Sequence, residues 1–335
     1  MIRYCRYIIL ILVIQLCYKV KGQDPQFSQF YSNPLYLAPS FAGLISDTRL
    51  SGNYRVQWPQ MPKPYTTFSL GIDHNFSVFN SGVGLYILKD VAGTGNLSTT
   101  FANLLYSYEF KISNFWYIRP GISFGYTERK IDFQELLWAD QISVEGNSAS
   151  SGELPPIQRT GDIDVSSSAM AYSDKFWFGF SADHLLKPNQ SLYEYDGDNN
   201  TIGYIPVKYT VFGGTKLINK GRLINPYDAS IQIAFLYKYQ DEFNQLDMGL
   251  YWYHKPLVLG VWYRGMTRTK DKISRDALIL LCGFKLDMIN IGYSYDFTIS
   301  RLINNTGGSH EFSLSYTFST IVKKQKFRSV PCPDF

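Results

Sequence analysis

The sequence predicts an all-β protein, a transmembrane antiparallel β-barrel of about fourteen strands with a non-barrel segment at its N-terminal end. Three observations predict this fold. Bulky apolar residues alternate with small or polar ones along many stretches, the connections between these stretches are short and long in turn, and the chain opens with a secretory signal. An even number of strands is typical of single-chain bacterial barrels.

The alternation is clearest in residues 115–133. Ile122 and Phe124 share one face of an extended chain, while Ser123 and Gly125 share the other, because successive strand side chains point to opposite sides. In a helix these apolar and small residues would mix on one face. Apolar residues outside and small or polar ones inside are what a lipid-facing wall requires, so this stretch is predicted to be a wall strand.

Residues 48–320 divide into strands by the same criterion. The expected strands are 48–58, 65–76, 82–90, 97–111, 115–130, 164–172, 176–187, 204–218, 228–240, 245–254, 257–267, 275–285, 288–298 and 309–320. The stretch LILLC at 278–282 does not alternate. Aromatic residues make up 16% of the chain, and strands with one greasy face account for such a content without a very apolar chain.

The connections between these strands carry independent information. Every second one is short, apart from 219–227, and the largest of the others are 131–163, 188–203, 268–274 and 299–308. Outer-membrane barrels keep their periplasmic turns short and their outer loops long. The lengths therefore predict that the N-terminal segment and the tail 321–335 lie in the periplasm, with the loops 131–163 and 188–203 outside.

Residues 1–22 are interpreted as a signal peptide, with a basic start, a short apolar core and Gly22 at the cleavage point. Cys17 also allows a lipoprotein, although the preceding Leu16 is bulky where a small residue is usual. Four of the 32 Lys and Arg residues lie in this signal, which leaves 28 against 28 Asp and Glu. A neutral mature chain gives no reason to expect nucleic acid as a partner.

Residues 23–47 break the barrel pattern. Three prolines prevent a regular helix or a central strand, yet the segment is too rich in aromatic and aliphatic residues for a loose tail. We expect this periplasmic or lumenal segment to lie against something, such as the barrel mouth; the alternative is an unstructured terminus. The candidate partner-binding residues are Asp24, Pro25, Phe27, Asn33, Pro34, Pro39 and Gly43, together with Trp138 in the long loop and Cys332 in the tail.

The sequence predicts no catalytic, metal or cofactor site. The four histidines lack neighbours at metal-ligand spacing, and adjacent Ser309, His310 and Glu311 point to alternate faces, which excludes a triad made by these three alone. The acidic run 193–198 lacks the ligand spacing of a calcium loop. The six tryptophans are interpreted as aromatic belts, with ligand stacking as an alternative for Trp138. The inward positions show no dense ring of charge.

Three stretches carry a resemblance to a known family. They are QDPQFSQFYSNPLYLAPSFAG (23–43), YRVQW (54–58) and GGSHEFSLSYTF (307–318), followed by VPCPDF at the end of the tail. The chain resembles the PorP/SprF family, and the likeness extends over essentially the whole mature chain. It implies an outer-membrane barrel of the type IX secretion system of Bacteroidota, whose partners are a secreted client surface protein, other secretion components and outer-membrane lipid.

The resemblance implies a non-enzymatic role in export or surface attachment of a particular cell-surface protein, such as a gliding adhesin. Two other functions stay open on the sequence. The alternative function is an outer-membrane channel or transporter for small solutes, because a barrel of this size encloses a lumen wide enough for a solute or a plug. A secreted soluble enzyme is the third, and solubility without detergent would favour it.

Overall fold

The computed structural model describes residues 24–45, 47–93, 95–133, 136, 141–143, 146–147, 158–192, 203–218, 229–269, 272–299 and 306–318. The signal peptide, the tail, Trp138 and Cys332 lie outside these residues. Within them, no helix has the length and apolar content that a membrane-spanning helix needs.

The described strands form one closed antiparallel barrel of fourteen strands, which confirms the predicted fold. Its strands are β1 (Thr48–Gln57), β2 (Tyr65–Phe76), β3 (Ser81–Ala92), β4 (Leu97–Tyr108), β6 (Tyr117–Lys130), β9 (Arg159–Tyr172), β10 (Phe176–Asp183), β11 (Lys208–Ile218), β12 (Ala229–Gln240), β13 (Phe243–His254), β14 (Leu257–Thr269), β15 (Lys272–Lys285), β16 (Ile289–Thr298) and β17 (Ser309–Phe318). Consecutive strands pair, and β1 pairs with β17, so the sheet closes without a free edge.

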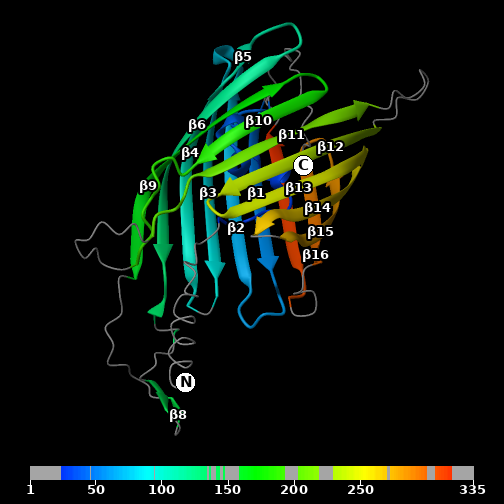
Figure 1. Ribbon diagram of the computed structural model, residues 1–335. Helices are drawn as coiled ribbons and strands as arrows, with labels where there is room; N and C mark the ends of the chain where they lie inside the picture. Colours follow the sequence, from blue (N-terminus) through cyan, green and yellow to red (C-terminus); the bar gives the residue numbers. More distant parts are fainter. Residues whose placement is uncertain are drawn as a thin grey trace, which may run out of the picture.

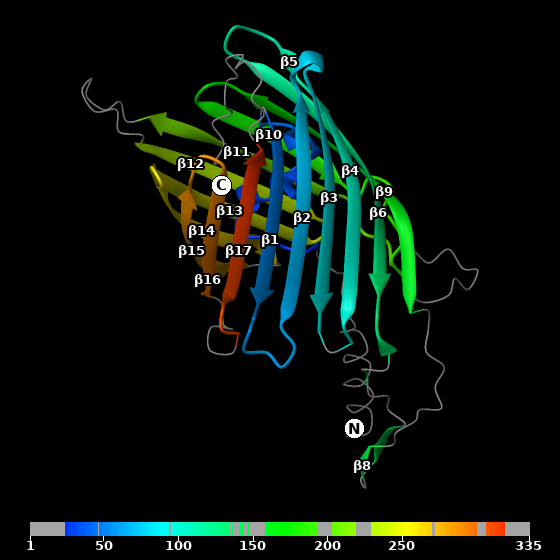
Figure 2. The same cartoon turned by 180° about the vertical axis from the view of Figure 1, so that it is seen from behind.

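The remaining strands are short. β5 (Phe110–Lys111) extends the edge of the β4–β6 hairpin, and β7 (Ile142–Ser143) pairs with β8 (Gly146–Asn147) in the loop after β6. Figure 1 faces strands β10–β14, which cross the view obliquely. Figure 2 faces β1–β4, which stand upright.

Each predicted strand corresponds to one wall strand, and the largest differences at the ends are those of β9, β10 and β11. The sequence predicted a strand at 176–187, but β10 ends at Asp183 because His184 adopts a left-handed conformation with φ of 61°. The next strand begins at Lys208 rather than 204, and β9 begins at Arg159 rather than 164. The side-chain contacts of His184, described below, explain why the chain leaves the sheet there.

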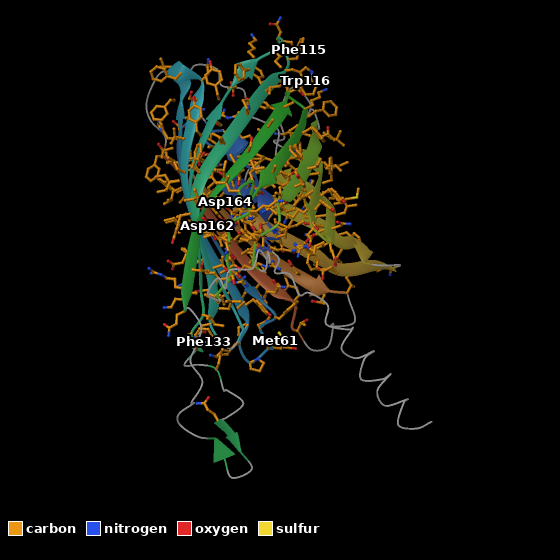
Figure 3. All side chains as sticks on the ribbon, turned by 60° about the vertical axis from the view of Figure 1, so that its left-hand side comes forward. Met61, Phe115, Trp116, Phe133, Asp162 and Asp164 are labelled. Atoms are coloured by element: carbon orange, nitrogen blue, oxygen red, sulfur yellow. The ribbon has the colours of Figure 1, made fainter. Side chains whose placement is uncertain are left out.

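The two faces of the wall differ as expected for a lipid-facing barrel. In β6, Phe124 and Tyr126 point outward and are 56% and 49% exposed, whereas Arg119 and Thr127 are buried inside. Figure 3 shows the side chains that surround the barrel. The outward apolar band is what acyl chains cover, and among the described strands no second sheet packs on it.

The aromatic belt prediction is wrong for two of the six tryptophans. Trp116 and Trp252 are exposed on the outer surface, and Trp116 lies near the end of the barrel opposite Met61 (Figure 3). Trp177 and Trp262 instead point into the barrel and are almost completely buried. Proximity to a strand end does not show which face a side chain occupies; the position within the two-residue repeat does.

The irregular stretch LILLC lies within β15, and its lack of alternation has a structural cause. Leu278 and Leu280 face outward, whereas Ile279 and Leu281 face inward and are buried. The inward pair belongs to a hydrophobic cluster with residues of the N-terminal segment. Both faces of this strand are therefore covered by apolar material, which removes the need for polar residues inside.

Residues 24–45 lie inside the barrel, where the dark blue segment is seen through the wall in Figures 1 and 2. We call this segment the plug. It contains three short helical turns, η1 (Phe30–Ser32), α2 (Pro34–Leu37) and η2 (Pro39–Phe41). All three are buried against the inner wall, with η2 contacting β4, β6 and β9.

Candidate functional site

The plugged lumen is the candidate functional site, and the plug adopts its turns for local reasons. Pro34 and Pro39 each occupy the first position of a helical turn, where the missing N–H costs nothing. Asn33 makes no side-chain cap; its amide nitrogen donates instead to Ser69 Oγ and Tyr86 Oη, each at 3.0 Å. The plug thus uses its polar groups to bind the wall.

Close approach between plug and wall depends on glycine. Gly43 has φ of 60°, a conformation that other residues rarely adopt. A Cβ at Gly82 of β3 would lie only 2.0 Å from the carbonyl oxygen of Ala42 in the plug. The backbone of the plug therefore lies directly on the backbone of the wall.

One side of the plug is apolar. Phe30 meets Trp262 edge to face, with 4.8 Å between the ring centroids, and Phe41 lies 5.4 Å from Phe212. Tyr31 contacts both Trp177 and Trp262. Full burial of each such side chain stabilises the docked plug by about 1.5–3 kcal/mol, so this aromatic contact supplies much of the binding.

Ser28 and Gln29, near the start of the plug, contact a buried network of charged side chains. Glu311 of β17 accepts hydrogen bonds from the backbone N–H groups of Ser28 (2.6 Å) and Gln29 (3.1 Å). Arg55 of β1 lies 3.2 Å from Glu311 and 2.9 Å from Asp296 of β16. The carboxylate that binds the plug is itself paired, which satisfies a charge that burial alone would make costly.

Ser28 is the centre of this network. Its hydroxyl donates to Asp296 at 2.6 Å and accepts hydrogen bonds from Arg55 at 2.6 Å and from Arg264 of β14 at 3.0 Å. Arg264 also lies 3.0 Å from Asp296. We name Ser28, Arg55, Arg264, Asp296 and Glu311 the arginine–carboxylate network. It joins four strands of the wall, β1, β14, β16 and β17, through one plug residue, so the plug completes the polar interior.

The sequence interpretation found no dense ring of charge at the inward positions and did not identify this cluster of ion pairs. Arg55, Arg264, Asp296 and Glu311 all occupy inward positions and are buried. The available signal was a charged residue at the same positions of the two-residue repeat as the small inward residues, which places its side chain inside the barrel. Their meeting could not be read from one strand, because it requires β1 to pair with β17 across barrel closure.

The end of the plug is held by a second set of charges. Arg119 of β6 donates to the carbonyl oxygens of Ala42 (2.7 Å) and Gly43 (2.8 Å). Asp73 of β2 accepts from the Gly43 N–H at 2.8 Å and pairs with Arg49 at 2.9 Å. Both polar groups of the plug backbone at Gly43 are therefore bound to charged side chains, which makes their hydrogen bonds stronger than neutral ones.

Asp24, at the start of the plug, forms a third charged contact. Its carboxylate lies 2.9 Å from His184 and 2.7 Å from Lys208 of β11. The other ring nitrogen of His184 lies 2.6 Å from Asp164 of β9. These four residues, the Asp24 cluster, tie the plug to the connection after β10 and explain the left-handed turn at His184.

The protonation states in the Asp24 cluster follow from its geometry. Burial opposes the charge of Asp24, but His184 and Lys208 outweigh it and hold the pKa of Asp24 well below its ordinary value. Burial likewise opposes the imidazolium, yet Asp24 and Asp164 raise the pKa of His184 to about 10. His184 is therefore a cation at neutral pH.

The structure brings seven of the nine predicted site residues together in the plug. Asp24 and Asn33 bind the wall through polar side chains, and Gly43 through its backbone. Phe27, Pro34 and Pro39 are buried, and the carbonyl of Pro25 accepts a hydrogen bond from Tyr36. Their contacts are with the barrel itself, and binding of an external partner by these residues stays a prediction.

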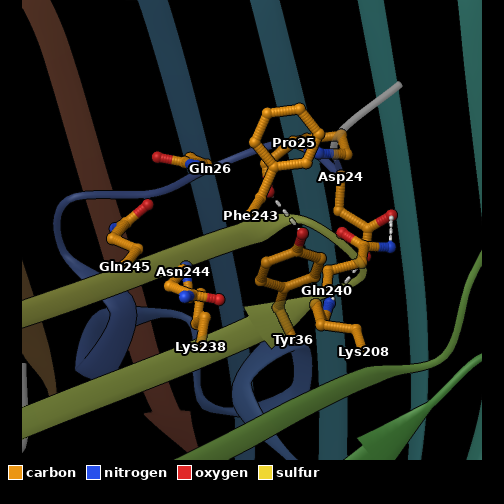
Figure 4. A pocket seen from close by; sticks show the side chains of 10 residues that line it. All are labelled: Asp24, Pro25, Gln26, Tyr36, Lys208, Lys238, Gln240, Phe243, Asn244 and Gln245. Carbon is orange, nitrogen blue, oxygen red and sulfur yellow. Dashed lines mark hydrogen bonds and ion pairs between the residues drawn. The ribbon is translucent and has the colours of Figure 1, made fainter. Parts of the chain in front are cut away.

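A small recess opens between the start of the plug and the hairpin that joins β12 to β13 (Figure 4). Its lining residues are Asp24, Pro25, Gln26, Tyr36, Lys208, Lys238, Gln240, Phe243, Asn244 and Gln245. The ammonium of Lys208 lies 5.0 Å above the ring of Tyr36. Within the described residues, no group of three or more His, Cys, Asp and Glu side chains is arranged to hold a metal ion.

The fold and the lumen can now be compared with known proteins. The family model described as "Type IX secretion system membrane protein PorP/SprF" matches residues 19–316. The chain belongs to the PorP/SprF family. The match takes in the plug and all fourteen strands of this PorP/SprF protein except the last two residues of β17.

Solved structures show the same fold at low identity. The CymD monoaromatic hydrocarbon channel has a TM-score of 0.50 and 9% identity, covering 86% of this chain and 93% of that one. A TodX deltaS2S3 mutant monoaromatic hydrocarbon channel has a TM-score of 0.51 and 9% identity, covering 85% and 94%. No curated protein matches the sequence. At such identities the likeness concerns the barrel fold alone.

The PorP/SprF family and the outer-membrane barrel fold together place the protein in the outer membrane. They identify a secretion or channel-type membrane protein rather than an enzyme. Membership of the type IX secretion family implies other secretion components as partners.

Proposed function

We propose that this PorP/SprF barrel assists the export or surface attachment of one particular cell-surface protein, such as a gliding adhesin, by serving as its scaffold in the outer membrane. The observation that carries the proposal is the plug. Aromatic packing and three sets of buried ion pairs hold residues 24–45 in the lumen. A lumen occupied by its own chain suits a scaffold better than an open pore.

We further propose an orientation from the connections. The turns 77–80, 173–175 and 255–256 lie at one end of the barrel, and the long connections after β6 and β10 lie at the other. Short turns are periplasmic in outer-membrane barrels. This orientation agrees with a periplasmic tail, since β17 ends at Phe318 on the short-turn end, beside Thr48.

The same orientation gives the plug a direction. Gly43 contacts the short-turn end through Asp73, whereas Asp24 lies beside Lys208 and Gln240, where β11 begins and β12 ends. In this orientation, the periplasmic position predicted for residues 23–47 suits only the part of the segment near residue 47. The beginning of the plug points toward the outer face, where an exported client would meet it.

Display of surface proteins tests the proposed function. A strain that lacks this barrel should lose one surface protein, or a small related set, while the remaining type IX cargo still reaches the surface. Expression of the wild-type chain from a plasmid should restore display. Unchanged surface composition in the deletion strain would refute the client-specific role.

Conductance separates the scaffold from the solute channel. In planar bilayers the purified wild-type protein is expected to give few or no open steps, because the plug occupies the lumen. Frequent large steps from the wild-type protein would favour a channel for small solutes. Purification from native membranes in mild detergent then identifies the client and the secretion components that remain bound.

A further inference from the structure

An apolar groove lies on the outer surface of the wall, over β11 and between β10 and β12. Its floor is Thr215, which has a small side chain and lies directly opposite Phe176 of β10 and Ile233 of β12. These two large side chains point outward on either side of Thr215 and are exposed. A small residue between two large ones on the same face leaves a hollow that is open to the membrane.

Other outward side chains give the groove its limits. Phe178 and Phe235 continue its two sides and close it at Gly213, where their ring edges come within 3.3 and 3.2 Å of the position that a Cβ would occupy. Trp116 borders the groove toward the short-turn end of the barrel (Figure 3). Met248 of β13 lies opposite Phe235 and borders it as well. The groove is therefore a bounded apolar site rather than part of an even surface.

The groove is continuous with the outward apolar band, which acyl chains cover in a lipid-facing barrel. We infer that it holds one acyl chain of an outer-membrane phospholipid as a fixed component of the barrel. Within the bilayer an apolar chain gains nothing from leaving water, so close packing decides which chain stays in place. A chain in the groove is packed from below and from both sides, whereas a chain on an even part of the wall is packed from one side only.

The width of the groove favours an acyl chain over a polypeptide helix. The two sides stand on β10 and β12, which are two strand spacings apart, or about 9.5 Å between their backbones. The side chains of the two strands narrow this space further. An α-helix with its own side chains is about 10–12 Å wide and would rest on top of the rings. An acyl chain carries no side chains and can reach the floor at Thr215.

The position of Trp116 indicates where the headgroup of this lipid lies. Trp116 is exposed near the end of the barrel, and tryptophans in such positions lie at the level of the lipid headgroups. The chain then enters beside Trp116 and extends toward Phe178 and Phe235. In the orientation proposed above, this end is periplasmic and the lipid belongs to the inner leaflet. The choice of leaflet rests on that orientation, whereas binding of the chain does not.

Native mass spectrometry of the full-length protein, purified in mild detergent and stripped of lipid, tests the groove. Two phospholipids with the same palmitoyl chains, a phosphatidylethanolamine and a phosphatidylglycerol, are titrated separately. Each should bind as one tightly held molecule per barrel, with similar affinities, because the chain is recognised rather than the headgroup. A preference of roughly tenfold or more for phosphatidylglycerol would show recognition of charge instead. That result, or weak and graded binding of several lipids, would overturn the inference.

Two pairs of variants locate the bound lipid. Thr215→Phe fills the floor and should lower the affinity for both lipids about tenfold, whereas Thr66→Phe adds the same ring at an outward threonine of β2 and should bind as wild type. Phe176→Ala removes one side of the groove without adding volume and should weaken binding roughly fivefold. Phe180→Ala, on the same face of β10, should not. Unchanged lipid binding in a folded Thr215→Phe or Phe176→Ala barrel would refute the site.

A second copy of the barrel is the other occupant that these measurements detect. A wild-type protein that is dimeric in mild detergent and becomes monomeric in Thr215→Phe would assign the groove to an interface between copies and overturn the lipid. The inference involves neither the plug nor a client, so the surface display of the deletion strain has no bearing on it. Failure of the lipid titration likewise leaves the client-specific role untouched.

Discussion

Glu311 and Ser28 are 283 positions apart in the chain, yet the Glu311 carboxylate accepts a hydrogen bond of 2.6 Å from the Ser28 N–H. The same carboxylate pairs with Arg55, which is directly opposite Glu311 in the register between β1 and β17. The strand pair that closes the barrel is therefore also the one that binds the beginning of the plug. Closure of the wall and docking of the plug depend on the same side chain.

Glu311→Ala should destabilise the folded protein by about 3–5 kcal/mol, since it leaves Arg55 buried with one fewer carboxylate and releases two plug N–H groups. Denaturant titration in detergent micelles measures this loss. Glu128→Ala is the matched control, because Glu128 pairs with the largely exposed Arg159 at 3.4 Å. The control should cost about 0–1 kcal/mol. Equal losses in both variants would contradict the role given to the network.

Gly82→Ala should displace the plug while the barrel still assembles. The added Cβ would lie 2.0 Å from the Ala42 carbonyl oxygen, which is backbone and cannot move aside without the plug. Planar bilayers should then show open steps that the wild-type protein lacks. Gly84→Ala, two residues along the same strand, meets its neighbours only at 3.5 Å and should behave as wild type. The contact would be disproved if the Gly82→Ala protein migrated on a gel as a folded barrel, like the wild type, and still showed no open steps.

The Asp24 cluster predicts a pH dependence whose sign follows from two opposite shifts. The raised pKa of His184 means that its contribution to stability is complete below about pH 6.5 and is lost as the pH rises through about 10. The lowered pKa of Asp24 means that its contribution is present above its ordinary value and is lost as the pH falls through the lower one. The cluster should stabilise the plug most between these limits.

Replacement of His184 by Gln measures this dependence. The free energy of unfolding of the wild type should exceed that of His184→Gln at pH 6.5, and the difference should shrink as the pH rises from 6.5 and vanish near 10. His254→Gln, at an exposed position near the end of β13, is the control and should show no such convergence. A difference that stays constant from pH 6.5 to pH 10.5 would exclude a charged His184.

The sequence was sufficient to predict the barrel wall, because the alternation of residues within one strand shows which side chains face outward and which face inward. Phe124 was predicted outward and is exposed there, and the closing strand, predicted at 309–320, is observed at Ser309–Phe318. The interior needed more than this local signal. Ile279 breaks the alternation because it packs with a plug residue far away in the chain, and no single strand contains that information.

The same reasoning explains which site residues were found. The prolines and aromatic residues of 23–47 marked the plug, because they fit neither a helix nor a wall strand. Arg264 and Asp296 gave no comparable signal, since an inward charged residue looks unsatisfied until its partner on another strand is known. Trp262 was assigned to a lipid interface because aromatic residues suit both a membrane belt and a buried core.

Phe30→Ala should loosen the plug from the apolar side and expose the tryptophans that it covers. Phe30 meets Trp262 at 4.8 Å, and loss of a buried Phe costs about 3–5 kcal/mol. Acrylamide quenching of tryptophan fluorescence provides the measurement, because Trp177 and Trp262 are buried whereas Trp116 and Trp252 are already exposed. The quenchable fraction should rise in Phe30→Ala. Phe68→Ala removes a ring of equal size from the outer surface of β2 and should leave it unchanged; a rise there as well would show that the whole barrel, rather than the plug, had loosened.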